Sequence, residues 1–302
     1  MRIGFGAPVS GAWATPQYLS RFAAEAEAAG YGSLWTFQRL LVPEGSAMEP
    51  VYHSVLDPMV ALGFAAAATS RIRLGVAVVN MPYLAKQAAS VDVLSNGRLD
   101  LGLGLGWMPE EFAAADAVMA GRGARTAEYI EVMRRLWAGG VAEFHGEHYT
   151  IPAGRAAPLP VQRPGPPVLL GGAVPRALQR VGRLADGWIT SSRADLSRIG
   201  EGIEVIRAAA ADAGRDPAAL RFICRGVVRW GTPVTVPEGG GRVPLSGGFD
   251  DIRADTQWLA EQGVTEVFYD LNWDPLVGAP DVDPAGAAAR AGEILEGLAP
   301  DR

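Results

Sequence analysis

The sequence contains little lysine, histidine or cysteine, and each shortage excludes a class of site. Lys86 is the only lysine among 27 basic residues, and we predict it inside a helix. It therefore does not suit a Schiff-base enzyme, which needs a lysine near a strand end. Three histidines, His53, His145 and His148, are too few for a barrel metal hydrolase, so we predict no metal site. The single cysteine, Cys224, cannot form an internal disulfide, which suits a reducing cytoplasm.

Long apolar runs and basic clusters are also missing. No apolar run reaches the length of about 18 residues that suggests a membrane span. Residues 1–5 enter a strand directly, so we also expect no signal peptide. The net charge is -6, from 27 basic and 33 acidic residues without a basic block, so we expect no nucleic-acid partner. The 302 residues are 49% hydrophobic, enough for a large core, and we predict a cytoplasmic globular protein.

Short apolar runs bounded by Gly and Pro alternate with longer runs rich in Ala, Leu and charge, which predicts strands alternating with helices. The predicted strands are Arg2–Gly6, Ser33–Thr36, Ile72–Val79, Leu99–Leu105, Val168–Leu170, Gly187–Thr190, Arg221–Trp230 and Thr265–Leu271. The predicted helices are Pro16–Ala29, Asp57–Thr69, Tyr83–Leu94, Thr126–Trp137, Pro175–Leu184, Leu196–Ala213, Asp250–Gln262 and Pro284–Leu298. Eight such pairs favour a single (β/α)8 TIM-barrel domain over residues 1–302, with short insertions that include a hairpin over Ala142–Ile151. An open doubly wound sheet is the alternative.

Tryptophans follow several predicted strands, at the end of a barrel where function resides. They are Trp13, Trp35, Trp107, Trp230 and Trp273. Five tryptophans at one rim suggest a flat, largely apolar ligand, and we predict that Trp13, Trp35 and Trp230 contact the substrate. The alternative is that these side chains pack loops against the barrel.

Glycines follow two of the predicted strands. Residues 171–175, Gly-Gly-Ala-Val-Pro, open a helix, and their N–H groups favour an anion such as a phosphate, although an ordinary tight turn is the alternative. Residues 102–106 contain G-x-G without the spacing of a dinucleotide motif, so we interpret them as making room inside the barrel. Asp92, Ser95 and Arg98 precede a strand, and we predict that they support the opposite end of the barrel.

The predicted mouth has few acid or base groups, which fits an enzyme whose bound cofactor performs the difficult step. The sequence also resembles the luciferase-like flavin and deazaflavin oxidoreductases of bacteria over nearly its whole length. The segments that carry this resemblance are residues 32–35, 68–75, 92–99, 102–107, 125–129, 171–172 and 183–188.

The resemblance implies a TIM barrel with a reduced flavin or deazaflavin across its mouth. In many members a non-proline cis peptide supports the back of the cofactor ring, and here it corresponds to Ala77 and Val78, with Asn80 just beyond. Gly106 and Trp107 correspond to residues at the ring edge.

The same resemblance assigns residues to the cofactor phosphate and tail. Gly171, Gly172 and Ala173 would bind the phosphate, while Ser191 and Ser192 would face the tail or the substrate. Sugar-phosphate dehydrogenases of the family carry a lysine after the sixth strand, and residues 191–194 contain none, which argues against a sugar-phosphate substrate.

One departure concerns the acid group of the deazaflavin members, which often carry Asp-His after the second strand. This chain has Gln38 and Arg39 there. Glutamine cannot serve as an acid and arginine stays protonated. A proton donor would then be His53, Glu110 or Tyr83. Alternatively, Arg39 binds an anionic part of the substrate or polarises its carbonyl. We accordingly predict Gln38, Arg39 and His53 as catalytic residues.

The leading hypothesis is hydride transfer between coenzyme F420, a 5-deazaflavin, and a small organic substrate. The alternative is a monooxygenase that uses O2 and reduced FMN from a separate reductase, which requires a pocket closed to water. A third reading is a barrel that binds cofactor without catalysis. The resemblance also implies a homodimer.

Overall fold

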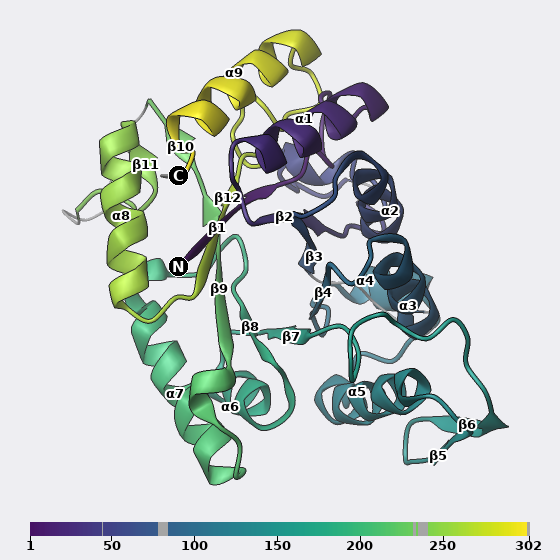
Figure 1. Cartoon of the computed structure of the whole chain (residues 1–302). Helices are drawn as coiled ribbons and strands as arrows, with labels where there is room; N and C mark the ends of the chain where they lie inside the picture. Colours follow the sequence, from purple (N-terminus) through teal and green to yellow (C-terminus); the bar gives the residue numbers. More distant parts are fainter. Residues whose placement is uncertain (44, 78–83, 232–233, 235–240, 301–302) are drawn as a thin grey trace.

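The structure is a computed structural model that describes residues 1–43, 45–77, 84–231, 234 and 241–300. The barrel strands are β1 (Arg2–Gly6), β2 (Ser33–Phe37), β3 (Arg73–Ala77), β4 (Leu99–Leu103), β7 (Val168–Gly171), β8 (Gly187–Ile189), β9 (Arg221–Val227) and β12 (Glu266–Asp270). These strands are parallel and close in the spatial order β1-β12-β9-β8-β7-β4-β3-β2 (Figure 1). The closed barrel confirms the (β/α)8 prediction and excludes the open doubly wound sheet, in which edge strands stay unpaired.

Helices surround this barrel on the outside (Figure 1). They are α1 (Pro16–Ala28), α2 (Pro58–Ala68), α3 (Leu84–Leu94), α4 (Pro109–Ala114), α5 (Arg122–Ala138), α6 (Pro175–Leu184), α7 (Ile199–Asp212), α8 (Phe249–Glu261) and α9 (Pro284–Gly297). Several of these helices begin with proline. Proline suits the first helical position because the N–H group that it lacks would have no partner there. Within the described ranges, no helix is long and apolar enough to cross a membrane.

The insertion after β4 differs from the sequence prediction. The predicted strand over 99–105 ends at Leu103, where its pairing with β7 ends at Leu170, and Gly106 beyond it has a φ of 73°, outside the strand region. α4 follows directly and was not predicted. α5 begins at Arg122 rather than at Thr126, so its first turn comes close to the mouth.

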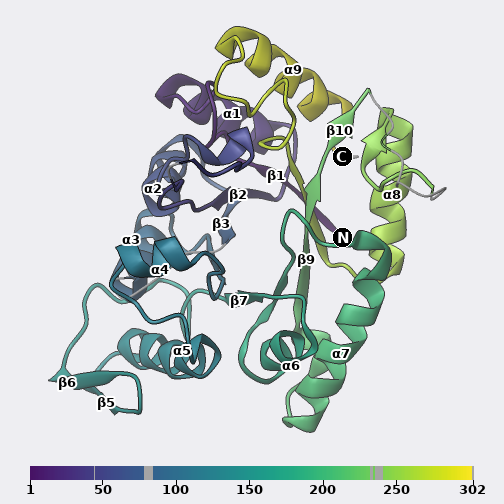
Figure 2. The ribbon, with the colours of Figure 1, turned by 180° about the vertical axis from the view of Figure 1, so that it is seen from behind.

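Two small sheets lie outside the barrel. The predicted strand over 221–230 is divided into β9 and β10 (Arg229–Trp230), and β10 pairs with β11 (Ser246–Gly247). The predicted hairpin is present as β5 (Ala142–His145) and β6 (Thr150–Gly154). Figure 1 and Figure 2 both show this hairpin at the periphery beside α5.

A network of buried charges closes the amino ends of the strands. Asp100 has no exposed surface and accepts hydrogen bonds from Arg73 Nε over 2.7 Å and from Arg221 Nη1 over 2.7 Å. Arg221 also donates to Glu266 over 3.0 Å. Burial would raise the pKa of Asp100, but the two arginines outweigh it and hold that pKa below its usual value.

The residues expected at this end are confirmed there. Arg98 is buried and donates to the backbone oxygens of Ser95 over 2.6 Å and of Thr69 over 3.1 Å. Asp92 accepts from the backbone N–H of Gln162 over 2.9 Å and from its side-chain amide over 2.6 Å. These contacts tie the turn before β4 to its neighbours and leave the opposite end of the barrel for function.

Candidate functional site

A cavity of about 530 Å³ opens at the carboxyl ends of the barrel strands. The loops after β2, β4, β7 and β8 form part of its wall, together with Arg225 within β9 and Trp273 after β12. The first turns of α5 and α6 complete it. Because catalytic residues of TIM barrels gather at this end, the cavity is the candidate active site.

The loop after β7 has an open backbone beside the start of α6. Gly172 has a φ of 146°, and a Cβ there would lie 2.5 Å from the Cβ of Ala177. The indole N–H of Trp188 donates to the Gly172 oxygen over 2.9 Å and holds the loop. Within the described ranges, the backbone N–H groups of Ala173 and Val174 have no acceptor. These groups and the start of α6 can therefore bind an anion.

Three arginines lie beside this loop, and we call them the arginine triad: Arg122 of α5 and Arg176 and Arg180 of α6. None of the three pairs with an acidic side chain in the part of the chain that the structure describes. Burial, together with the charge of Arg122, lowers the pKa of Arg180. The triad concentrates positive charge where the open backbone favours an anion.

Sequence reasoning missed the arginine triad. Arg122 lies in the insertion before the predicted start of the helix, so it had no expected place at the mouth. Arg176 follows the glycine loop directly, and this adjacency was the signal that could have identified it.

Another part of the wall alternates arginines with aromatic rings. We call it the cation–aromatic wall and define it by Trp107, Arg39, Tyr52, Trp273 and Arg225. The guanidinium carbon of Arg39 lies 4.5 Å from the Tyr52 ring centroid and 5.3 Å from that of Trp107. The Tyr52 and Trp273 centroids are 5.7 Å apart, and the Arg225 guanidinium carbon lies 4.2 Å from Trp273. Tyr52 and Trp273 meet edge-to-face at 82°, so the wall is not one flat stack, and Trp107, which is 58% exposed, is the ring that suits a flat ligand.

Each arginine of the cation–aromatic wall pairs with one carboxylate. Arg39 Nη1 donates to Glu111 Oε1 over 2.9 Å, and the same oxygen accepts from the backbone N–H of Leu40 over 2.9 Å. Arg225 Nε donates to Asp270 Oδ2 over 2.7 Å. The wall therefore offers N–H donors without the net positive charge of the arginine triad.

The cavity brings together nine of the residues predicted from the sequence. They are Gln38, Arg39, Gly106, Trp107, Gly171, Gly172, Ala173, Ser191 and Ser192. Their individual roles remain predictions. Ala77 is the last residue of β3. Val78 and Asn80, with the candidate acid Tyr83, lie outside the described residues.

Two tryptophans expected at the rim, Trp35 and Trp13, are buried in the core, so their predicted contact with the substrate has no support in this placement. Trp35 is 1% exposed and lies inside the barrel, where its ring stacks on Phe268 with centroids 5.2 Å apart. Its indole N–H donates to Glu266 over 2.9 Å, toward the end of the barrel opposite the cavity. Trp13 is also 1% exposed and packs edge-on against Phe22. Both side chains belong to the hydrophobic core and do not line the cavity.

Three further candidates lie away from the cavity lining. Trp230 stacks on Phe249 with ring centroids 4.9 Å apart, so its predicted contact with substrate has no support in this placement. His53 is exposed, and its Nε2 lies 3.2 Å from the Met48 oxygen. Glu110 is exposed on α4. Neither His53 nor Glu110 lines the cavity, which leaves Arg39 as the charged residue of the predicted catalytic set that does.

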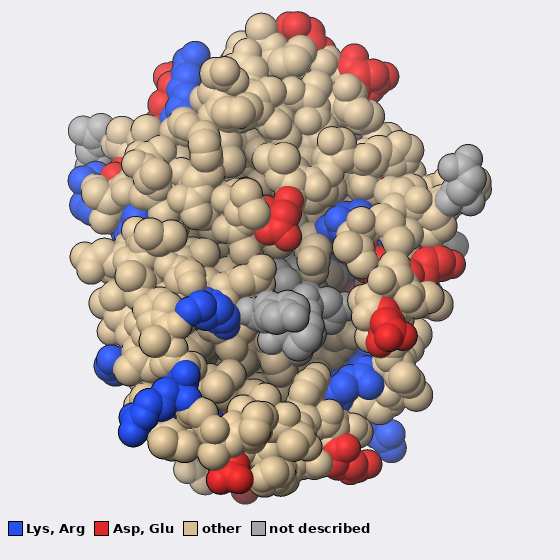
Figure 3. Space-filling model, turned by 90° about the vertical axis from the view of Figure 1, so that its right-hand side faces the viewer, with Lys and Arg blue, Asp and Glu red and all other residues tan. Residues whose placement is uncertain are grey.

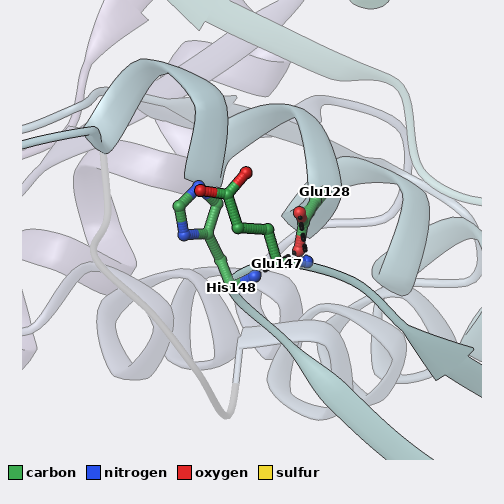
Figure 4. Close-up of side chains that lie close together, drawn as sticks. All are labelled: Glu128, Glu147 and His148. Atoms are coloured by element: carbon green, nitrogen blue, oxygen red, sulfur yellow. Dashed lines mark hydrogen bonds between the residues drawn. The ribbon is translucent and has the colours of Figure 1, made fainter.

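Glu128, Glu147 and His148 lie close together at the peripheral hairpin, with possible ligand atoms within 4.8 Å of one another (Figure 4). The Glu128 carboxylate accepts backbone hydrogen bonds from Glu147, His148 and Tyr149 over 2.8, 2.9 and 3.1 Å. Desolvation would raise the pKa of Glu128, but these hydrogen bonds lower it. We interpret the cluster as the structural attachment of the hairpin turn to α5.

Comparison with known sequences identifies one family. The family described as luciferase-like monooxygenase matches residues 3–233. An uncharacterized protein of Mycobacterium tuberculosis, Rv0953c, is 39% identical over 180 residues, which cover 57% of this chain and 62% of that protein. The match thus spans less than two thirds of the length of that relative.

Solved structures share the fold. Monooxygenase RslO1 from Streptomyces bottropensis is 21% identical with a TM-score of 0.75, and the match covers 99% of this chain and 98% of that one. The coenzyme F420-dependent tetrahydromethanopterin reductase of Methanopyrus kandleri is 18% identical with a TM-score of 0.72, covering 97% and 98%. At these identities the likeness concerns the fold alone.

Proposed function

Because this chain belongs to the luciferase-like monooxygenase family, we propose that it is an oxidoreductase that transfers a hydride between coenzyme F420 and a small organic substrate. The observation that carries the proposal is the arginine triad beside the open backbone of residues 171–174. Together they would form a site for a permanently anionic group at one end of the cavity, whose other two arginines, Arg39 and Arg225, pair with carboxylates.

The residues of this site suit the anionic part of F420. Its phosphodiester is followed by a chain of glutamates, so it carries several negative charges along an extended tail, whereas FMN ends in one phosphate. The N–H groups of Ala173 and Val174 would bind the phosphodiester. The three arginines, which have no acidic partner among the described residues, then provide more positive charge than a single phosphate needs.

The remaining residues of the cavity position the ring and the substrate. Gly104 and Gly106 line the cavity without side chains of their own, and the ring of Trp107 is exposed at its mouth. Arg39 and Ser192 would face the substrate. The cofactor, when bound, supplies or accepts the hydride, and one proton exchanged with solvent balances a carbonyl–alcohol pair.

A monooxygenase that uses FMN reduced by a separate reductase is the second candidate, and RslO1, itself a monooxygenase, has an equally similar fold. Such an enzyme must keep water from its oxygenated cofactor. Trp107 is 58% exposed at the mouth of this cavity, which favours hydride transfer over oxygenation.

The proposal is tested by removing charge from the triad. We expect the double variant Arg176→Gln/Arg180→Gln to weaken F420 binding by about tenfold or more and to reduce its dependence on salt. Arg183→Gln is the matched control, since Arg183 is exposed in the last turn of the same helix and does not line the cavity. Equal F420 affinity in the double variant and the control would contradict the proposed anion site.

We also propose that two copies associate through α2 and α3. α2 contains no charged residue, yet Val60 is 72% and Phe64 45% exposed, and Leu94 of α3 is 73% exposed. Figure 3 shows this side of the molecule, where charged side chains are separated by wide uncharged areas. A second copy would cover this apolar face without burying charge on α2. Light scattering should give twice the 31.8 kDa chain mass, and Val60→Asp should give monomer. A monomeric unmodified chain would contradict the pairing.

A further inference from the structure

The arginines that line the cavity differ in whether a carboxylate pairs with them. The arginine triad has no acidic partner within the described ranges. Arg39 pairs with Glu111 and Arg225 with Asp270 in the cation–aromatic wall. One end of the cavity therefore attracts permanent negative charge, whereas the wall presents hydrogen-bond donors with little net charge.

The donors of Arg39 are only partly used. Nη1 donates to Glu111 Oε1 over 2.9 Å and faces the sulfur of Met108 at 3.6 Å. Nε is buried without an acceptor, and Nη2 donates to no residue that the structure describes. The side chain is only 6% exposed and is held between Tyr52 and Trp107. Nη2 is thus a fixed N–H donor that lacks an oxygen to bind, whereas the Nε atom has no surface that a ligand could reach.

We propose that Arg39 Nη2 binds the oxygen of an uncharged carbonyl or alcohol group, and that Glu111 makes the cavity select neutral over anionic substrates. The inference rests on the proposed function, because it concerns the substrate of the same cavity. The exposed ring of Trp107 would stack on a flat substrate body. Arg39 would then stabilise the negative charge that grows on the substrate oxygen during reduction.

The neutral preference follows from the position of Glu111. A carboxylate at Nη2 would be attracted by Arg39 but repelled by Glu111, which pairs with Nη1 of the same guanidinium. A carbonyl oxygen avoids that repulsion and still accepts a hydrogen bond from Nη2. Arg39 therefore acts as a hydrogen-bond donor that determines specificity, with Glu111 as its positioning residue.

Acetophenone and benzoate provide a matched pair of probes, because both carry a carbonyl carbon on a benzene ring and they differ in charge. Their binding to the purified chain is measured by equilibrium dialysis in phosphate buffer, where phosphate competes for the arginine triad. We expect acetophenone to bind at least about tenfold more tightly than benzoate. Benzoate binding as tightly as acetophenone, or acetophenone failing to bind in the millimolar range, would overturn the inference.

Variants of Glu111 and Arg39 then test each residue of this ion pair. Glu111→Gln keeps an oxygen for Leu40 but removes the charge, so benzoate should gain about tenfold relative to acetophenone. Arg39→Gln should weaken acetophenone by about tenfold. If Arg39→Gln folds poorly, Arg39→Lys replaces it in the test. Lysine keeps a charged N–H donor, so this variant should retain part of the acetophenone binding. Glu49→Gln is the control. Glu49 forms an exposed ion pair with Arg193, also 2.9 Å long, and neither residue lines the cavity.

The two proposals fail in different ways. If F420 does not bind but the preference for acetophenone persists and depends on Glu111, the proposed cofactor is wrong and the inference stands. If F420 binds but Glu111→Gln leaves the ratio of the two affinities unchanged, the inference is wrong and the proposed function stands.

Discussion

Asp100→Asn tests whether the charge network at the amino ends of the strands stabilises the fold without affecting the cavity at the other end. The Asp100 carboxylate is fully buried between Arg73 and Arg221 at the amino ends of the strands. The amide would keep the shape but leave two guanidinium groups with too little negative charge. Loss of one partner from a buried charge network costs about 3–5 kcal/mol. We therefore expect a fall of roughly 6–10 °C in the melting temperature.

The pH dependence has a defined sign. Because the folded protein lowers the pKa of Asp100, this group stabilises the fold fully above its ordinary pKa of 3.8, and the contribution is lost as pH falls through the lowered value. The difference in unfolding free energy between the unmodified chain and the variant should therefore be constant near neutrality and shrink below about pH 4.

Urea unfolding followed by circular dichroism measures this difference at each pH. Glu201→Gln is the control, since Glu201 forms an exposed pair with Arg198 and its loss should change stability little. F420 affinity of Asp100→Asn should stay unchanged, because the cavity lies at the other end of the barrel. A destabilisation no larger than that of the control would refute the reasoning, as would a difference that grows in acid.

Three further predictions concern single side chains. Gly172→Ala should weaken F420 binding about tenfold in a fluorescence titration. The reason is that residue 172 has a φ of 146° and that its new Cβ would lie 2.5 Å from the Cβ of Ala177. Unchanged affinity would contradict this prediction, because it would show that the loop adapts. Trp107→Ala should weaken cofactor or substrate stacking by about 1 kcal/mol in calorimetry, and no change would mean that the ring lies elsewhere. Although burial opposes it, backbone N–H groups of residues 70–72 lower the pKa of Glu27 to about 2. Glu27→Gln should therefore lower the free energy of unfolding by about 2 kcal/mol in urea near pH 7, and this difference should fade between pH 4.5 and 2. A difference that does not fade over that range would contradict the role of the Glu27 charge.

Local signals in the sequence predicted most of the fold and one part of the site. Each helix start and strand is encoded within a few residues, so the barrel followed from the count of alternating elements. The Gly171–Gly172 pair before a proline-initiated helix was informative for the same reason. In contrast, Glu111 lies 72 positions from Arg39 along the chain. No spacing rule connects such a pair before the barrel closes.

The tryptophans show a second limit. A tryptophan near the end of a strand can point into the barrel or toward its mouth, and composition does not distinguish the two. Trp35 points inward because Gly75 on the adjacent strand leaves room, since a Cβ there would lie 2.3 Å from the indole ring. Trp273 reaches the cavity because it follows β12 rather than lying within a strand.

The most direct test of the central claim is a fluorescence titration of the purified protein with coenzyme F420 and, in parallel, with FMN. The arginine triad and the open backbone beside it predict micromolar or tighter binding of F420 and clearly weaker binding of FMN. FMN binding as tightly as F420, or no binding of F420, would contradict the account.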